Sequence, residues 1–424
     1  MEGAVILVGV VLVYALFSQF LARTPITGPI IFVLFGVLAG PEALDLVTVE
    51  LTNEAIQIVL EATLVIILFT DAAVIDVAAV RRQLTIPTRL LTIGLIGTIA
   101  AGIGLAAVMF GELGFWGAAV VAITLAPTDA ALGQAVITND RVPSPVRQGL
   151  SVESGLNDGI AVPFLSIAIA GAAGEMSTAT GVFRLVLEEI GIAILVGVVV
   201  GFVGAKLITA CSTRGWMSLE WRRMSVPILA VLCYLVATPI DGSGFIASFV
   251  GGMAFGNIVR DRYPDICTLS EATSYLMTML SFFLFGALIF GPRIADITLE
   301  IVLYAVASLT VIRMIPVGLA MIGSRFTTRT VLFLGWFGPR GIASLVFAGT
   351  LVAEYDPVST EATLTIVSAT VALSVLLHGL SAWPLSNRYG ASFAGLDDAS
   401  AVEEMQEVGE IRVRRRVTPA HRQR

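Results

Sequence analysis

The chain has 424 residues, of which 56% are hydrophobic and 13% charged, and its formal net charge is -7. That much apolar surface cannot be enclosed in a single soluble core, so the composition excludes a soluble globular protein and indicates a polytopic membrane protein. The three cysteines show no paired spacing, and the sequence contains no His-Glu-x-x-His motif, so neither a disulfide framework nor a zinc hydrolase is expected.

The apolar stretches predict an all-α protein with thirteen transmembrane helices. A helix needs about 20 mostly apolar residues to span a bilayer. In chain order, the predicted helices cover residues 3–22, 26–40, 55–77, 86–109, 115–137, 146–172, 184–210, 225–239, 243–258, 271–291, 299–322, 329–351 and 361–386.

The basic residues predict the orientation of these helices. If the N-terminus lies outside, 21 of the 25 Lys and Arg residues fall in inside loops or in the tail, which matches the excess of basic residues in cytoplasmic loops. Only Arg184 and Arg293 fall outside, and Arg313 and Arg340 lie within helices. We therefore expect a multi-pass protein of the plasma or inner membrane with a cytoplasmic C-terminus. The polar, basic tail at 387–424 is interpreted as an anchor to the membrane surface.

Two of the predicted helices are interrupted at matching positions. If the seventh helix is a connector between two sets of six, the fifth helix corresponds to the twelfth. Pro127 interrupts the fifth, beside Asp129, and Gly338-Pro339-Arg340-Gly341 interrupts the twelfth. Each break alone could be an ordinary proline kink. Two matched breaks, each with a charge, favour a transporter site built from inverted repeats.

The sixth predicted helix carries polar groups that suit a small cation. Ser154 and Asp158 are four residues apart and share one helix face, so their oxygens could bind an alkali cation or a proton. Asp129 could add an oxygen, and the break at Thr128 frees a backbone carbonyl. A charge at this depth costs roughly 2.5–3.5 kcal/mol on insertion scales, which indicates an ion path. Competition between cation and proton for Asp158 would make exchange obligatory.

Other charged residues in the helices need separate interpretations. Glu153 requires a buried partner, and only Arg313 and Arg340 lie at membrane depth. We predict Arg340, because its broken helix should cross the fifth helix beside the sixth. Asp71 either lines the entry to the site or is a carboxylate at a helix end that reaches water. His378 is interpreted as a packed imidazole rather than a pH sensor.

The motifs resemble those of a known family. Thr128-Asp129, Glu153-Ser154 and Asn157-Asp158, with the later Gly338-Pro339-Arg340-Gly341, closely resemble the signature of the cation:proton antiporter 1 group, the NhaP-like and NHE-like sodium/proton antiporters. The resemblance runs through all thirteen helices. Two departures are the proline that precedes Thr128-Asp129 and the aspartate at Asp71, where many members have glutamate.

The resemblance implies an NhaA-like antiporter fold in a homodimer. The implied interface domain comprises 1–80 and 225–291, the implied mobile core comprises 86–172 and 299–386, and 184–210 connects them. Asp158 would bind the ion or the proton, assisted by Asp129, Ser154, the Thr128 carbonyl and Asp71. Asn157 would stabilise the crossing, and Glu153 would pair with Arg340.

The function expected from these features is exchange of one Na⁺ for one H⁺ by alternating access, and the resemblance implies electroneutral exchange for an antiporter with the Asn157-Asp158 pair. Exchange of K⁺ for H⁺ is the alternative within transport, since cavity dimensions decide selectivity. An ion channel and a membrane hydrolase are the alternatives from other classes. We expect no enzyme activity, no cofactor beyond the transported ions, and as partners Na⁺, Li⁺ or K⁺, protons, the lipid bilayer and a second copy, but no nucleic acid.

Overall fold

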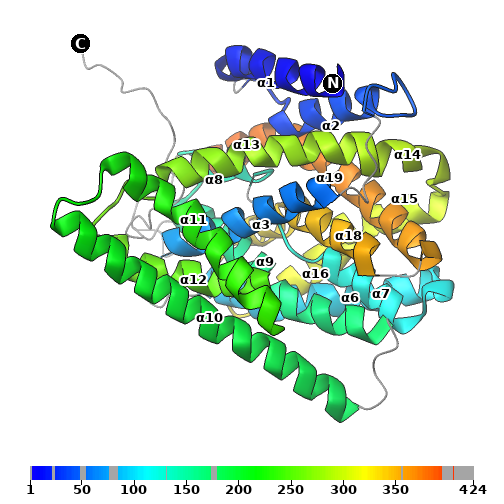
Figure 1. Ribbon diagram of the computed structural model, residues 1–424. Coiled ribbons are helices and arrows are strands. Elements are labelled where there is room, and N and C mark those ends of the chain that lie inside the picture. Colours follow the sequence, from blue (N-terminus) through cyan, green and yellow to red (C-terminus); the bar gives the residue numbers. More distant parts are fainter. Residues whose placement is uncertain are drawn as a thin grey trace.

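A computed structural model describes residues 2–21, 24–47, 54–75, 85–129, 131–172, 179–354, 357–393 and 404. Helices are the only regular structure within these ranges, which confirms the predicted all-α class (Figure 1). Among the described residues, eight helices combine the length and the apolar composition needed to cross a bilayer, and four shorter apolar helices accompany them. The number of crossings, thirteen, stays a prediction.

Every predicted range overlaps a helix or a run of adjacent helices. The first half contains α1 Glu2–Leu21, α2 Gly28–Ala39, α3 Glu54–Val74, α5 Thr85–Arg89, η1 Leu90–Gly94, α6 Leu95–Met109, η2 Gly111–Leu113, α7 Gly114–Thr124, α8 Gln134–Ile137, α9 Ser144–Ala172 and α10 Ala179–Thr213. The second half contains α11 Leu219–Ala237, η3 Thr238–Ile240, α12 Gly244–Val259, α13 Thr268–Leu284, η4 Phe285–Phe290, α14 Gly291–Arg293, η5 Ile294–Asp296, α15 Leu299–Leu309, α16 Val311–Ala320, α17 Thr328–Trp336, α18 Ile342–Glu354 and α19 Pro357–Ala391.

Some boundaries differ from the prediction. The predicted helix at 299–322 is divided at Thr310, whose backbone angles of -117° and -89° are not helical, into α15 and α16. The last helix continues to Ala391, so the first residues of the predicted tail at 387–424 are helical. Beyond Phe393, the structure describes only Glu404, and the remainder of the predicted tail lies outside the described residues.

Both predicted interruptions are present and are longer than single kinks. α7 ends at Thr124 and α8 begins at Gln134, so the break includes Pro127 and starts before it. α17 ends at Trp336 and α18 begins at Ile342. Proline lacks an amide donor and clashes with the preceding turn, while glycine favours non-helical backbone, which explains why both helices end here.

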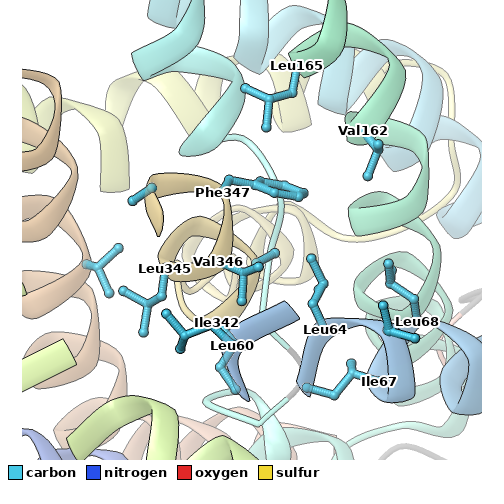
Figure 2. Packing of buried hydrophobic residues seen from close by; sticks show 14 of the residues in the cluster. Leu60, Leu64, Ile67, Leu68, Val162, Leu165, Ile342, Leu345, Val346 and Phe347 are labelled. Atoms are coloured by element: carbon cyan, nitrogen blue, oxygen red, sulfur yellow. The ribbon is translucent and has the colours of Figure 1, made fainter. Parts of the chain in front are cut away.

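Large apolar side chains fill the contact between α3, α9 and α18. Figure 2 shows Leu64 of α3 next to Val346 of α18, with Phe347 on the same helix; Leu68 lies further along α3, and Val162 lies on α9. All five are buried. This apolar contact brings α3 beside the two helices that carry or flank the predicted site.

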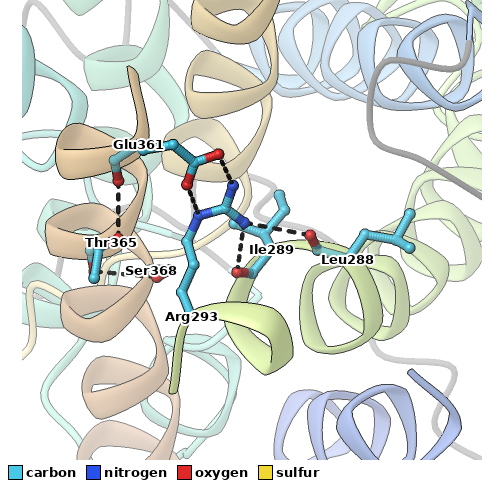
Figure 3. A network of polar contacts seen from close by, with 6 residues as sticks. All are labelled: Leu288, Ile289, Arg293, Glu361, Thr365 and Ser368. Atoms are coloured by element: carbon cyan, nitrogen blue, oxygen red, sulfur yellow. Dashed lines mark hydrogen bonds and ion pairs between the residues drawn. The ribbon is translucent and has the colours of Figure 1, made fainter. Parts of the chain in front are cut away.

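A polar contact links two elements near the start of α15. Arg293, the last residue of α14, donates to both carboxylate oxygens of Glu361 on α19, at 3.0 and 2.9 Å (Figure 3). It also donates to the carbonyls of Leu288 and Ile289 at 3.4 and 2.9 Å. The guanidinium therefore links the carbonyls near the end of η4 to the Glu361 carboxylate of α19.

Candidate functional site

The backbone segments of the two breaks are hydrogen-bonded to each other. The amide of Asp129 donates to the carbonyl of Pro339 at 2.7 Å. Gly341 makes this approach possible, because a Cβ atom there would collide with the carboxylate of Asp129. The two broken helices therefore cross at these residues, as the matched interruptions predicted.

Asp129 uses both carboxylate oxygens to cap backbone amides. Oδ1 accepts from the amides of Ala131 and Leu132 at 2.6 and 3.0 Å, and Oδ2 accepts from the amide of Ile342 at 2.7 Å. Ile342 begins α18, so the negative charge faces the positive pole of that half-helix. A carboxylate has about four acceptor sites, and at least three are used here, so Asp129 acts mainly as a backbone cap.

Arg340, from the second break, binds backbone carbonyls of the first break. Its side chain is fully buried, and its guanidinium donates to the carbonyls of Ala126 and Pro127 at 2.6 and 3.3 Å. These carbonyls follow the last turn of α7, where the helix pole is negative and carbonyls lack helical partners. The amide of Arg340 donates to Ser374 of α19 at 2.7 Å. Each break thus supplies the charge that neutralises a half-helix end of the other.

Glu153 pairs with Arg313 of α16, so the predicted Glu153–Arg340 pair is wrong. Glu153 Oε1 lies 2.5 Å from Arg313 Nη2, and the two side chains are 2% and 1% exposed. The guanidinium of Arg340 is instead held by the carbonyls at the end of α7. Arg313 also packs against the second break, because a Cβ on Gly338 would lie 2.5 Å from its Nε.

Three polar side chains join α9 to the first break. Asn157 Nδ2 donates to Thr128 Oγ1 at 2.6 Å, and Thr128 Oγ1 lies 3.2 Å from Ser154 Oγ. All three residues are buried. Asp158 follows Asn157 directly on α9, is half-buried, and lies one helical turn beyond Ser154 on the same face.

Asp71 of α3 faces the same part of α9. It is half-buried, and its Cβ lies 3.7 Å from where a Cβ on Gly155 would be. Gly155 stands next to Ser154 in α9. Four of the predicted residues therefore lie near the crossing: Thr128, Ser154 and Asn157 are in direct contact, and Asp71 lies beside α9.

Sequence reasoning missed Ser344 and Ser374, which help to hold the crossing. Ser344 donates to the carbonyl of Thr124, the last residue of α7, at 2.6 Å. Ser374 Oγ lies 3.1 Å from His378 Nδ1, and His378 Nε2 lies 2.9 Å from the carbonyl of Trp336, the last residue of α17. His378 is fully buried, in line with a packed imidazole. The available signal was the pair Ser374 and His378, a serine and a histidine four residues apart in an apolar helix that follows the broken helix at 329–351.

Discontinuous helices whose half-helix ends meet inside a bundle define a class of membrane protein. Secondary transporters build their ion sites from such ends, and irregular backbone at membrane depth is tolerated where it is buried in protein or lines a cavity. The fold and the crossing therefore have the architecture of an ion-coupled transporter.

The family model described as "Sodium/hydrogen exchanger, transmembrane" matches residues 7–388. The chain belongs to this family, and the resemblance seen in its motifs is confirmed.

Relatives with known names are similar over much of the chain. It is 26% identical over 352 residues to the K(+)/H(+) antiporter NhaP of Alkalimonas amylolytica, covering 81% of this chain and 59% of that protein. It is 24% identical over 310 residues to a Na(+)/H(+) antiporter of Schizosaccharomyces pombe, covering 66% of each. The chain thus spans less than two thirds of these relatives' lengths.

The fold is similar to a solved structure of the sodium proton antiporter MjNhaP1 from Methanocaldococcus jannaschii at pH 8. The TM-score is 0.75 at 21% sequence identity, and the match covers 89% of this chain and 97% of that one. The predicted antiporter fold is thereby confirmed.

Proposed function

We propose that this protein is a secondary active antiporter that exchanges a monovalent cation for a proton. The observation that carries the proposal is the crossing, where Asp129 and Arg340 compensate the half-helix ends and Thr128 and Ser154 join the break to α9. Charges at such a depth are stable only when compensated. Asp158, one turn from Ser154, then supplies the carboxylate for the transported ion.

The proposed mechanism is competition at Asp158. With Asp158 ionised, its carboxylate, the hydroxyl of Ser154 and the Thr128 carbonyl form a set of hard oxygen ligands for a cation, and the charges of Asp71 and Asp129 lie close to this set. With Asp158 protonated, the cation has no counter-charge and leaves. Asn157 holds Thr128 to α9 in both states.

Alternating access follows from the division of the fold that we propose. The core, 86–172 and 299–386, moves against the interface domain, 1–80 and 225–291, which a second copy stabilises; 184–210 connects the two. Where Leu64 of α3 packs near Phe347 of α18, the contact is made by buried apolar side chains, which suits such sliding (Figure 2). We propose that the N-terminus faces outward, the C-terminus inward, and that the membrane is the plasma or inner membrane.

Na⁺ is the proposed cation, and exchange is proposed to be electroneutral, one Na⁺ for one H⁺. The similar proteins include both Na(+)/H(+) and K(+)/H(+) antiporters, so K⁺ is the second candidate. Ligand oxygens alone accept either ion, and the dimensions of the site decide between them.

Purified protein in vesicles that contain a pH-sensitive dye tests the proposal. Addition of Na⁺, Li⁺ or K⁺ should change the internal pH, and Asp158→Asn should abolish the change. Asp140→Asn is the matched control, because Asp140 is 80% exposed and pairs with Arg147 at the surface. Normal exchange by Asp158→Asn would reject the role of Asp158, and no cation-dependent pH change in the parent would reject antiport.

A further inference from the structure

Glu404, which follows α19 in the sequence, has its carboxylate buried at the start of α17. Glu404 is only 2% exposed, although it belongs to the polar segment that follows α19. Its Oε1 accepts from the amide of Thr327 at 2.8 Å, from the hydroxyl of Thr327 at 2.9 Å and from the hydroxyl of Thr330 at 2.5 Å. Three donors on one buried oxygen form a specific binding site rather than a passing surface contact.

The receiving end of α17 attracts negative charge. Thr327 is the N-cap of this nine-residue helix, and its hydroxyl accepts from the Thr330 amide at a long 3.4 Å. The first amides of a helix lack helical partners and carry the positive end of its dipole. Glu404 therefore adds a charged cap to a helix end that its own threonine caps weakly.

Hydroxyl and aromatic groups complete the site. Thr330 Oγ1 lies 2.8 Å from the hydroxyl of Tyr389 on α19. Because Thr330 gives its one proton to Glu404, Tyr389 is the donor in that contact. Tyr389 stacks on Phe333 of α17 with ring centroids 4.0 Å apart, and Phe393 packs on its edge. Among the described residues no basic side chain pairs with Glu404, so amide and hydroxyl donors recognise it.

The opposite end of α17 leads directly into the crossing. Nine helical residues span roughly 13 Å, and the break from Phe337 to Gly341 follows at once. The carbonyl of Trp336, at the end of α17, is 2.9 Å from His378 Nε2. A shift at the start of this short helix would therefore reach Pro339, whose carbonyl accepts from the amide of Asp129.

We propose that Glu404 is a positioning residue for transport: it caps the start of α17 and so holds the second break in its cation-binding geometry. The inference rests on the proposed antiport function, but the capping itself does not. Glu404 contacts no transported ion; it acts through α17.

Transport by the full chain tests the positioning role. In Glu404→Ala, the cation concentration that gives half-maximal exchange should rise by at least about threefold, with the maximal rate and folded yield retained. Glu404→Gln should fall between alanine and the parent, because it keeps an acceptor oxygen but loses the charge. Glu42→Ala, which makes the same charge change at an exposed position, should behave like the parent.

Thr330→Val is a second variant that removes the receiving hydroxyl without touching the tail. It should raise the half-maximal concentration similarly, and its combination with Glu404→Ala should add nothing further, because both remove one interaction. Unchanged half-maximal concentrations in both variants, or a loss of maximal rate together with folded yield, would overturn the positioning role.

Hydrogen exchange tests the capping without any transport. Amides in residues 327–331 should exchange faster in Glu404→Ala than in the parent and in Glu42→Ala. Equal exchange in all three proteins would overturn the capping. If the parent shows no cation-dependent proton movement but this difference in exchange is present, the antiport proposal fails while the capping stands.

Discussion

The buried pair of Glu153 and Arg313 makes a sharp prediction about stability. Arg313→Met removes the charge and keeps an unbranched side chain of similar reach. It leaves the Glu153 carboxylate 2% exposed and without an ion-pair partner among the described residues, and Oε2 of that carboxylate already accepts no hydrogen bond there. Removing one member of a buried pair costs about 3–5 kcal/mol, so the variant should melt well below the parent.

The double variant Glu153→Gln with Arg313→Met separates charge from packing. Because it leaves no isolated charge, it should recover much of the stability that the single variant loses. We expect this recovery because Arg313 Nε and Nη1 and Glu153 Oε2 lack hydrogen-bond partners in the described part of the chain, so the native pair itself is incompletely satisfied.

Thermal melting of the purified protein in detergent, followed by the folded fraction on size-exclusion chromatography, measures these differences. Arg147→Met is the control, because the Arg147–Asp140 pair is 22% and 80% exposed and should contribute at most about 1 kcal/mol. If Arg313→Met melts at the same temperature as Arg147→Met, or if the double variant is no more stable than Arg313→Met, the energetic interpretation of the Glu153–Arg313 pair is incorrect.

Two further predictions concern the crossing. Gly341→Ala should abolish exchange and lower the melting temperature, because the new methyl group would displace the carboxylate of Asp129. Gly104→Ala on α6 is the control: a Cβ there meets nothing within 4 Å, so exchange and melting temperature should stay unchanged. Equal behaviour of the two variants would contradict the crossing geometry. The exchange rate in vesicles should not respond to an imposed membrane potential if transport is electroneutral, and a rate that follows the potential would argue for movement of net charge.

Local sequence signals were sufficient to predict most of the fold. The apolar runs predicted where the helices lie, and Pro127 and the Gly338–Gly341 segment predicted both breaks, because these residues act on the backbone at their own positions. The division at Thr310 was missed, since no proline or glycine stands there and the apolar run continues through it.

The partners of the buried charges could not be predicted in the same way. Arg313 and Arg340 both lie at membrane depth, and only the three-dimensional arrangement decides which of them reaches Glu153. The half-helix end of α7 competes for Arg340, and that competition depends on how the two breaks cross. Glu404 was missed for a related reason: its burial results from donors on α17, which are distant in sequence.

The paired charges around the crossing bear on the stoichiometry of exchange. Asp129 and Arg340 face opposite half-helix ends, and Glu153 and Arg313 neutralise each other, so these four residues add no net charge to the core. Asp71 belongs to α3, in the part proposed to stay fixed. Of the charges around the crossing, a moving core would then carry only that of Asp158 with its bound ion uncompensated by these pairs. One monovalent cation or one proton neutralises this carboxylate equally, so the core would carry the same charge in both directions.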